Sequence, residues 1–148
     1  MFLFITLPSF AQLRVIGIQT QADTLVFNIS GEAAELYKGQ KGYILKDTSY
    51  PQNDASISLY LGETKEKSVE SLRVLIDLCK NDVGTTFTFE DAQGVMYYGI
   101  TASELRTIRT QNYHESNGIM IANSNMNRAK LFKRISLQHI ITYYFDKL

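Results

Sequence analysis

The chain has 148 residues, of which 45% are hydrophobic and 20% are charged, and its formal net charge is zero. This length and balance are those of a single globular domain, and they exclude a fibrous repeat and a largely disordered chain. Proteins that track nucleic-acid phosphates carry a basic surface, so the zero net charge argues against a nucleic-acid partner.

Residues 1–11 resemble the end of a secretory signal peptide. Residues 2–7 are almost wholly apolar, and Ser9 and Ala11 stand three and one before a possible cleavage ahead of Gln12. The apolar run is short and no basic residue precedes it, so a first strand is the alternative. We expect a truncated signal followed by one α+β domain at residues 12–148. The protein is then periplasmic or extracellular; the alternative is cytoplasmic.

Four strands are predicted before residue 65. Residues 25–29 and 56–61 alternate between apolar and polar side chains, as a strand with one buried face does. Residues 13–18 and 42–46 are short apolar runs of strand-like composition. A loop that contains Pro51 is expected between the strands at residues 42–46 and 56–61.

A helix is predicted over residues 65–82. Thr64 can accept from the free N–H groups of its first turn, and Gly84 allows a left-handed exit after it. We expect Arg73 and Asp77 to pair on its solvent side. Its apolar side chains recur at helical spacing and should face a core: Val69, Leu72, Leu75, Ile76, Leu78, Cys79 and Val83.

Cys79 is the only cysteine of the chain. A single cysteine forms no intrachain disulfide and no multi-cysteine metal site. Its place on the apolar stripe predicts a buried, unreactive thiol rather than a nucleophile.

A hairpin is predicted after the helix. Residues 86–90 and 95–100 have an extended pattern, and Asp91-Ala92-Gln93-Gly94 supplies turn residues between them. Residues 118–122 form another short apolar strand. Residues 111–117 and 123–127 are expected to be loops.

The last segment, residues 136–148, fits either a helix or a strand. Its apolar residues fall on one helical face with Ser136 as the N-cap, but β-branched and aromatic residues also favour a strand. We favour the helix. The predicted fold is therefore α+β, a mainly antiparallel sheet of five or more strands packed against one long central helix, with a second helix at the C-terminus.

Catalytic and metal-binding motifs are absent from the sequence. There is no G-x-S-x-G elbow, and the chain has only two histidines, His114 and His139. His114 and Glu115 begin like a zinc-protease motif, but Gly118 stands where the second histidine is required. No catalytic residue, metal ligand or cofactor is predicted. The sequence therefore favours a protein that is not an enzyme.

Positive charge gathers near the C-terminus. Residues 1–100 have a net charge of −4 and residues 101–148 of +4. The densest basic stretch is Arg128, Lys130, Lys133 and Arg134. We interpret this stretch as a solvated face; the alternative is a contact with an anionic partner or a membrane surface. No run reaches the roughly 18 apolar residues of a transmembrane helix.

These features favour a small exported interaction or structural module, with another protein or a glycan as its partner. The alternative is a small enzyme or ligand-binding protein that uses the loop around His114, with Tyr113, Arg128 and Lys130 as its binding residues. Anion binding by the basic stretch is a third hypothesis.

Overall fold

A computed structural model describes Leu13 and residues 23–29, 34–48, 57–108 and 112–148, with the backbone alone for residues 104–108 and 112–116. The elements in chain order are β1 (Thr24–Asn28), β2 (Ala34–Gly39), β3 (Gly42–Asp47), β4 (Ser58–Gly62), α1 (Lys65–Leu78), β5 (Thr86–Glu90), β6 (Met96–Ile108), β7 (Asn112–Asn123), β8 (Ala129–Lys133), α2 (Arg134–Tyr143) and the 3-10 turn η1 (Phe145–Lys147).

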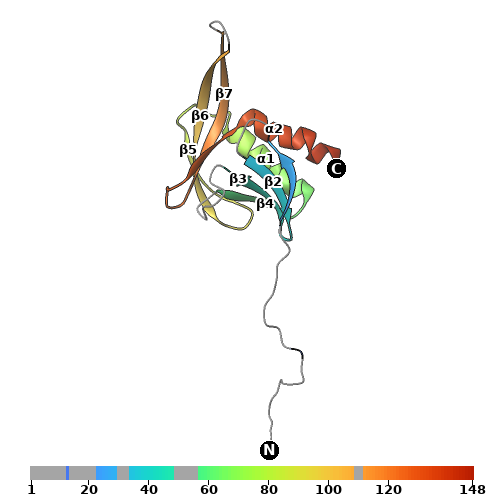
Figure 1. Ribbon diagram of the computed structural model, residues 1–148. Coiled ribbons are helices and arrows are strands. Elements are labelled where there is room, and N and C mark those ends of the chain that lie inside the picture. Colours follow the sequence, from blue (N-terminus) through green and yellow to red (C-terminus); the bar gives the residue numbers. More distant parts are fainter. Residues whose placement is uncertain (1–12, 14–22, 30–33, 49–56, 109–111) are drawn as a thin grey trace, which may run out of the picture.

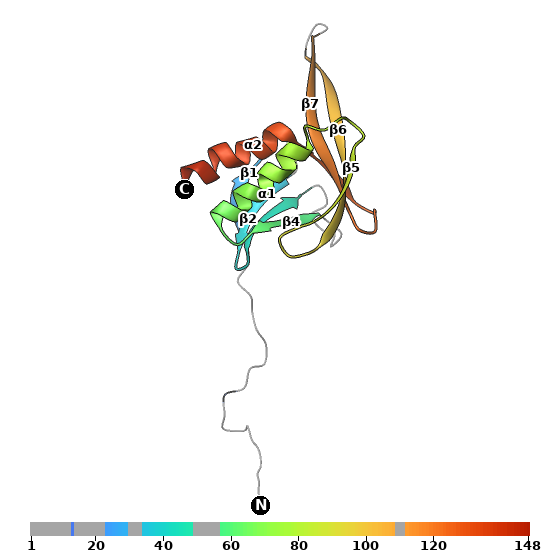
Figure 2. The same cartoon turned by 180° about the vertical axis from the view of Figure 1, so that it is seen from behind.

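The fold is a mixed α+β fold with two antiparallel four-stranded sheets and two helices. One sheet has the order β1-β2-β3-β4 and is followed by α1; the other has the order β5-β6-β7-β8 and is followed by α2. The same order of elements thus occurs twice, although the sequence shows no repeat. In Figures 1 and 2 the helices lie side by side over the first sheet, and the second sheet stands across one end of this layer.

The prediction of one sheet of five or more strands around one long central helix is wrong. The first sheet ends with β4. Helix α1 then connects it to a second sheet, which begins with β5, and β5 pairs with β6. Strands that follow one another in the chain tend to lie next to one another, so each run of four strands forms its own meander. The core is shared by two helices, because α1 packs against both β4 and α2, and α2 also contacts β7 and β8.

Helix α1 begins where the sequence predicts and ends earlier. Thr64 Oγ1 accepts from the N–H of Lys67 at 3.2 Å, which confirms it as the N-cap. The helix ends at Leu78 rather than at residue 82, and Val83 is exposed to solvent. Asp77 pairs with Lys80, at 3.3 Å between Oδ1 and Nζ, instead of with Arg73.

The predicted C-terminal helix is present as α2, but its first residue is Arg134. Its N-cap is Lys133, whose side chain makes no capping hydrogen bond, and Ser136 lies buried inside the helix. Strand β8 runs directly into α2, so no loop is available in which Ser136 would act as a cap. Beyond α2, the rings of Tyr43 and Phe145 meet edge to face, with 4.9 Å between their centroids.

Most predicted strands are found, and the differences follow from pairing. Strands β2 and β8 were not predicted, and residues 111–117, expected to form a loop, belong mostly to β7, which starts at Asn112. Strand β7 pairs with β6 without a break from Asn112 opposite Ile108 to Asn123 opposite Tyr97. A continuous ladder satisfies polar backbone groups whatever the side chains are, so local composition does not reveal such a strand. The predicted strand at residues 13–18 lies outside the described residues except for Leu13.

One hydrophobic cluster takes side chains from both halves of the chain. The first sheet and α1 contribute Leu36, Leu45, Leu59, Leu72, Ile76 and Cys79; the second sheet and α2 contribute Ile119, Ile121, Phe132, Leu137, Ile140 and Ile141. A hydrogen bond joins the halves at the end of α1, where Thr101 Oγ1 donates to the carbonyl of Leu78 at 3.0 Å. Each half therefore completes the core of the other.

We predict that Leu72→Ala lowers the free energy of unfolding by about 2–5 kcal/mol, because it empties a fully buried site in the shared cluster. Val74→Ala, two residues away on the exposed face of the same helix, is the matched control and should cost under about 1 kcal/mol. Urea unfolding followed by circular dichroism measures both. Equal costs would contradict the burial of α1 through Leu72.

Cys79 is fully buried, as the sequence predicts, and burial raises the pKa of its thiol to about 11. We predict very slow alkylation by iodoacetamide in the folded protein near neutral pH and fast alkylation in denaturant. Because the raised pKa favours the neutral thiol in the folded state, this group should lower stability as the pH rises from about 9 to about 11. Rapid alkylation of the folded protein would contradict the burial.

Candidate functional site

A wide apolar hollow lies on the face of the second sheet that points away from the helices. We call it the outer groove. It encloses about 670 Å³ and is lined by Thr86, Phe87, Thr88, Tyr98, Gly99, Ile100, Met120, Ala122, Ser124, Met126 and Ala129. This volume is within the range of pockets that hold ligands.

The outer groove exposes apolar side chains that a buried sheet face would cover. Tyr98 is 37% exposed, Ile100 39% and Met126 66%, and they come from β6 and from the turn between β7 and β8. Single exposed apolar residues are common on proteins, whereas a contiguous group marks a surface that binds something. Methionine adapts its shape to different apolar partners, so the two methionines of the groove suit recognition.

Met126 is held over the groove by a closed turn. It has a φ of 61°, a left-handed conformation that costs a non-glycine residue free energy. The turn is fixed by Asn123, whose carbonyl accepts from the N–H of Met126 at 2.9 Å and whose Oδ1 accepts from the N–H of Asn127 at 3.1 Å. A strained residue held by its surroundings at the rim of a groove indicates a functional position.

The outer groove provides contact area and hydroxyl groups, and its lining contains no carboxylate, amine, imidazole or thiol. The polar groups around the apolar floor are the hydroxyls of Thr86, Thr88, Tyr98 and Ser124. Acid–base or nucleophilic chemistry at neutral pH requires titratable groups that this lining does not have. The groove is thus suited to binding.

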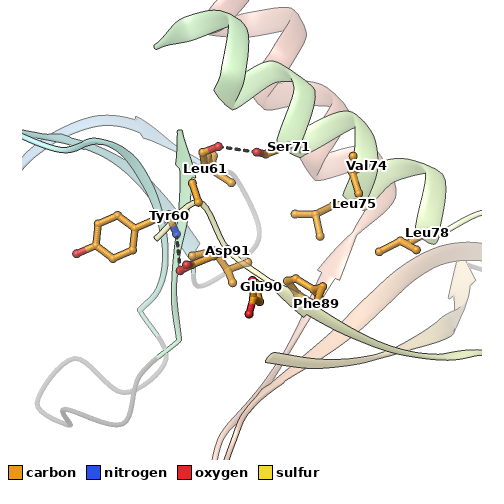
Figure 3. A pocket seen from close by; sticks show the side chains of 11 residues that line it. Tyr60, Leu61, Ser71, Val74, Leu75, Leu78, Phe89, Glu90 and Asp91 are labelled. Carbon is orange, nitrogen blue, oxygen red and sulfur yellow. Dashed lines mark hydrogen bonds between the residues drawn. The ribbon is translucent and has the colours of Figure 1, made fainter. Parts of the chain in front are cut away.

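A smaller apolar hollow, which we call the junction pocket, lies where α1, β4 and the β5–β6 turn meet (Figure 3). It encloses about 190 Å³, and its walls are mainly Leu59, Leu61, Val74, Leu75, Leu78 and Phe89. Ser71 Oγ donates to the carbonyl of Leu61 at 2.5 Å across one side. The volume is below the range of typical ligand pockets and matches a single small apolar group.

Glu90 and Asp91 both line the junction pocket, but they do not form a catalytic pair of carboxylates. Asp91 is used by the fold: its Oδ1 accepts from the N–H groups of Gln93 and Val95, and its Oδ2 accepts from the N–H of Tyr60. These three backbone donors hold the Asp91 carboxylate in the turn, whereas Glu90 is exposed. The turn is therefore a structural joint between β4 and the second sheet.

Tyr97 ties the two sheets together beside this joint. Its hydroxyl donates to the carbonyl of Ser58 at 2.8 Å, and its ring stacks on Phe89 with 5.9 Å between centroids. Burial raises the pKa of Tyr97 to about 12, and the nearby Asp91 carboxylate acts in the same direction. The phenol stays neutral and acts as a hydrogen-bond donor.

The binding residues predicted from the sequence are spread over β7, the turn after it and β8. Tyr113 pairs with Thr107 and His114 with Arg106 in the outer part of the β6–β7 ladder, where the side chains lie outside the described residues. Arg128 accepts through its carbonyl from the N–H of Asn123, nine positions from His114 and so about 30 Å along the strand.

Lys130 is also distant from His114. It pairs with Ile121, seven positions from His114 along β7, or about 23 Å. The backbone thus separates the pair Tyr113 and His114 from the pair Arg128 and Lys130. The described backbone does not bring the four residues to one place. The remaining basic residues, Lys133 and Arg134, lie at the join of β8 and α2.

Two further features of the described part of the chain concern metals and membranes. No three His, Cys, Asp or Glu side chains gather there into a cluster that could hold a metal ion. Neither α1 nor α2 has the length and apolar character needed to cross a bilayer.

The outer groove was missed from the sequence, although a signal was present. In residues 95–100 nearly every position is apolar or aromatic. A strand with one face in water should carry polar residues at alternate positions, and β6 carries Met96, Tyr98 and Ile100 there instead.

Comparison of the chain with protein-family models, with curated proteins and with solved structures gave no match. The chemistry of the two hollows is therefore inferred from their own residues.

We predict that Tyr97→Phe lowers the free energy of unfolding by about 1–2 kcal/mol, because the partly buried carbonyl of Ser58 loses its donor. Tyr98→Phe, the next residue on the exposed face, is the matched control and should change stability by less than about 0.5 kcal/mol. Because the pKa of Tyr97 is raised in the folded state, the wild type should also lose stability between pH 10 and about 12. An unchanged unfolding midpoint for Tyr97→Phe would disprove the bridging role.

Proposed function

We propose that the protein is a small exported interaction module that binds an apolar segment of a protein in its outer groove. The observation that carries the proposal is the contiguous exposed apolar surface formed by Tyr98, Ile100 and Met126. Soluble proteins rarely leave such a surface uncovered unless a partner buries it.

The composition of the outer groove favours a protein partner over a glycan. Sugars are bound by stacking together with many directed hydrogen bonds, and the floor made of Ile100, Met120 and Ala122 offers no such bonds. An apolar side chain gains roughly 1.5–3 kcal/mol when it is fully buried on such a floor. The absence of titratable groups from the lining favours binding over catalysis.

The exported location is part of the proposal and rests on residues 1–11. Mass spectrometry of the protein isolated from its source should find a mature N-terminus at Gln12, as the small residues at Ser9 and Ala11 predict. A mature chain that retains residues 1–11 would place the protein in another compartment and refute this part of the proposal.

Binding is tested with an array of random heptapeptides probed with the purified protein. We predict that the protein selects peptides with at least two apolar residues, and that Tyr98→Asp weakens this binding at least about tenfold, because it places a charge in the groove. Val83→Asp is the matched control, since Val83 is an exposed apolar residue outside the groove. If no apolar peptide binds, or if both variants bind alike, the outer groove is not the binding site.

Met126→Gly separates binding from stability. Glycine adopts the left-handed conformation without strain, so this variant should be as stable as the wild type or more stable, by up to about 1 kcal/mol. Peptide affinity should fall severalfold, because the exposed side chain that covers the groove is lost. Thermal unfolding and peptide titration measure the two effects. A lower melting temperature with unchanged affinity would contradict a role of Met126 in binding.

A further inference from the structure

Strand β5 leaves one edge of the second sheet open. Within the described part of the chain, β5 pairs with β6 alone. The N–H of Thr101 donates to the carbonyl of Thr85 at 2.8 Å, and that of Asp91 donates to the carbonyl of Val95 at 2.9 Å. Because hydrogen-bonded and non-hydrogen-bonded pairs alternate in an antiparallel ladder, the backbone groups of Thr86, Thr88 and Glu90 point away from β6.

The open edge is also one wall of the outer groove. The side chains of Thr86, Thr88 and Glu90 are exposed, and both threonines line the groove, whereas Phe87 and Phe89 are partly buried against the core. A strand added along this edge would place alternate side chains over the groove and beside the two phenylalanines. It would therefore need apolar residues at nearly every position.

After the signal proposed at residues 1–11, a segment of that kind occurs at residues 13–18, with the sequence Leu-Arg-Val-Ile-Gly-Ile. Four of its six residues are large and aliphatic. Three of these four, Val15, Ile16 and Ile18, are β-branched and favour strands. Leu13, its one described residue, is 96% exposed. Burial of aliphatic side chains of this kind on a partner surface would be favourable.

We propose that residues 13–18 of one copy of the protein bind as an added antiparallel strand along β5 of a second copy. This inference rests on the proposed function and names the apolar segment that the outer groove receives. In the proposed register Arg14 lies opposite Glu90, Ile16 opposite Thr88 and Ile18 opposite Thr86.

This register satisfies charge, shape and backbone together. Arg14 meets the exposed carboxylate of Glu90, a favourable cross-strand pair at the last residue of β5. Ile16 and Ile18 extend the apolar surface formed by Tyr98 and Ile100, the residues that pair with Thr88 and Thr86 in β6. The opposite register, with parallel strands, places Arg14 at the uncharged Thr86 end and leaves Glu90 beside Ile18.

The segment is too short to reach β5 of its own chain in this register. Asp23, to which it is joined, is fixed to Lys46 at 3.0 Å and lies against Gly39, at the end of the β2–β3 hairpin. That hairpin end also contacts Gly62, beside the first turn of α1.

The beginning of β5 lies at the other end of α1. Thr85 is bonded to Thr101, whose hydroxyl donates to the carbonyl of Leu78 in the last turn. The 14-residue helix is about 21 Å long, whereas the five Cα–Cα steps from Ile18 to Asp23 span at most about 18 Å. A strand seated with Ile18 at Thr86 therefore comes from another molecule.

A charge-exchange experiment on the full chain tests the proposal. Sedimentation velocity over a range of micromolar concentrations should show reversible self-association of the wild type. Arg14→Glu and Glu90→Arg should each weaken this association about fivefold or more, because each places like charges opposite one another. The double variant Arg14→Glu with Glu90→Arg should restore most of it. Glu70→Arg, which reverses an exposed charge on α1, is the control and should associate like the wild type.

Each result supports or overturns the proposal. Restored association in the double variant, with weakened association in both single variants, supports the proposed strand. A wild type that stays monomeric overturns it, and so does association that neither single variant weakens or that the double variant fails to restore. A monomeric wild type that still binds apolar peptides in the groove refutes the second copy as the partner and leaves the proposed function standing. A monomeric wild type that binds no apolar peptide refutes both the added strand and the proposed function.

Discussion

The pair of helices α1 and α2 is the element on which both sheets depend. Each sheet has an apolar inner face. A four-stranded sheet does not form a stable domain unless another layer covers that face. Leu72 and Ile76 of α1 and Leu137 and Ile140 of α2 lie in the same buried cluster as the inner residues of both sheets. Removal of either helix would therefore expose both sheets, and the two runs of four strands, which look alike in outline, are not independent units.

This shared core also explains why one face of the second sheet stays open. Both helices lie on its inner side, where Ile119, Ile121 and Phe132 are buried, and no third layer covers Tyr98 and Ile100 within the described part of the chain. A sheet with apolar residues on both faces normally lies between two layers. The missing layer is the physical basis for placing the partner on the outer groove, and the open edge of β5 suggests how a strand would begin to supply it.

The sequence predicts well those elements whose signals are local. The N-cap at Thr64, the burial of Cys79, the hairpin around Asp91 to Gly94 and the terminal helix each follow from a few adjacent residues. The division into two sheets and the length of the β6–β7 ladder depend on pairing between distant residues, which no single segment encodes. The outer groove as a whole could not be predicted for the same reason, because Tyr98 and Met126 are 28 positions apart and line one groove only in the folded protein.

The central claim is that the two halves form one core, and equilibrium unfolding with one probe in each half tests it most directly. Exposure of the Cys79 thiol reports on the first half, and the imidazole signal of His139, which packs on Tyr143 in α2, reports on the second. A shared core predicts coincident transitions with a single midpoint in urea. Two separated midpoints, with one half melting while the other persists, would contradict it.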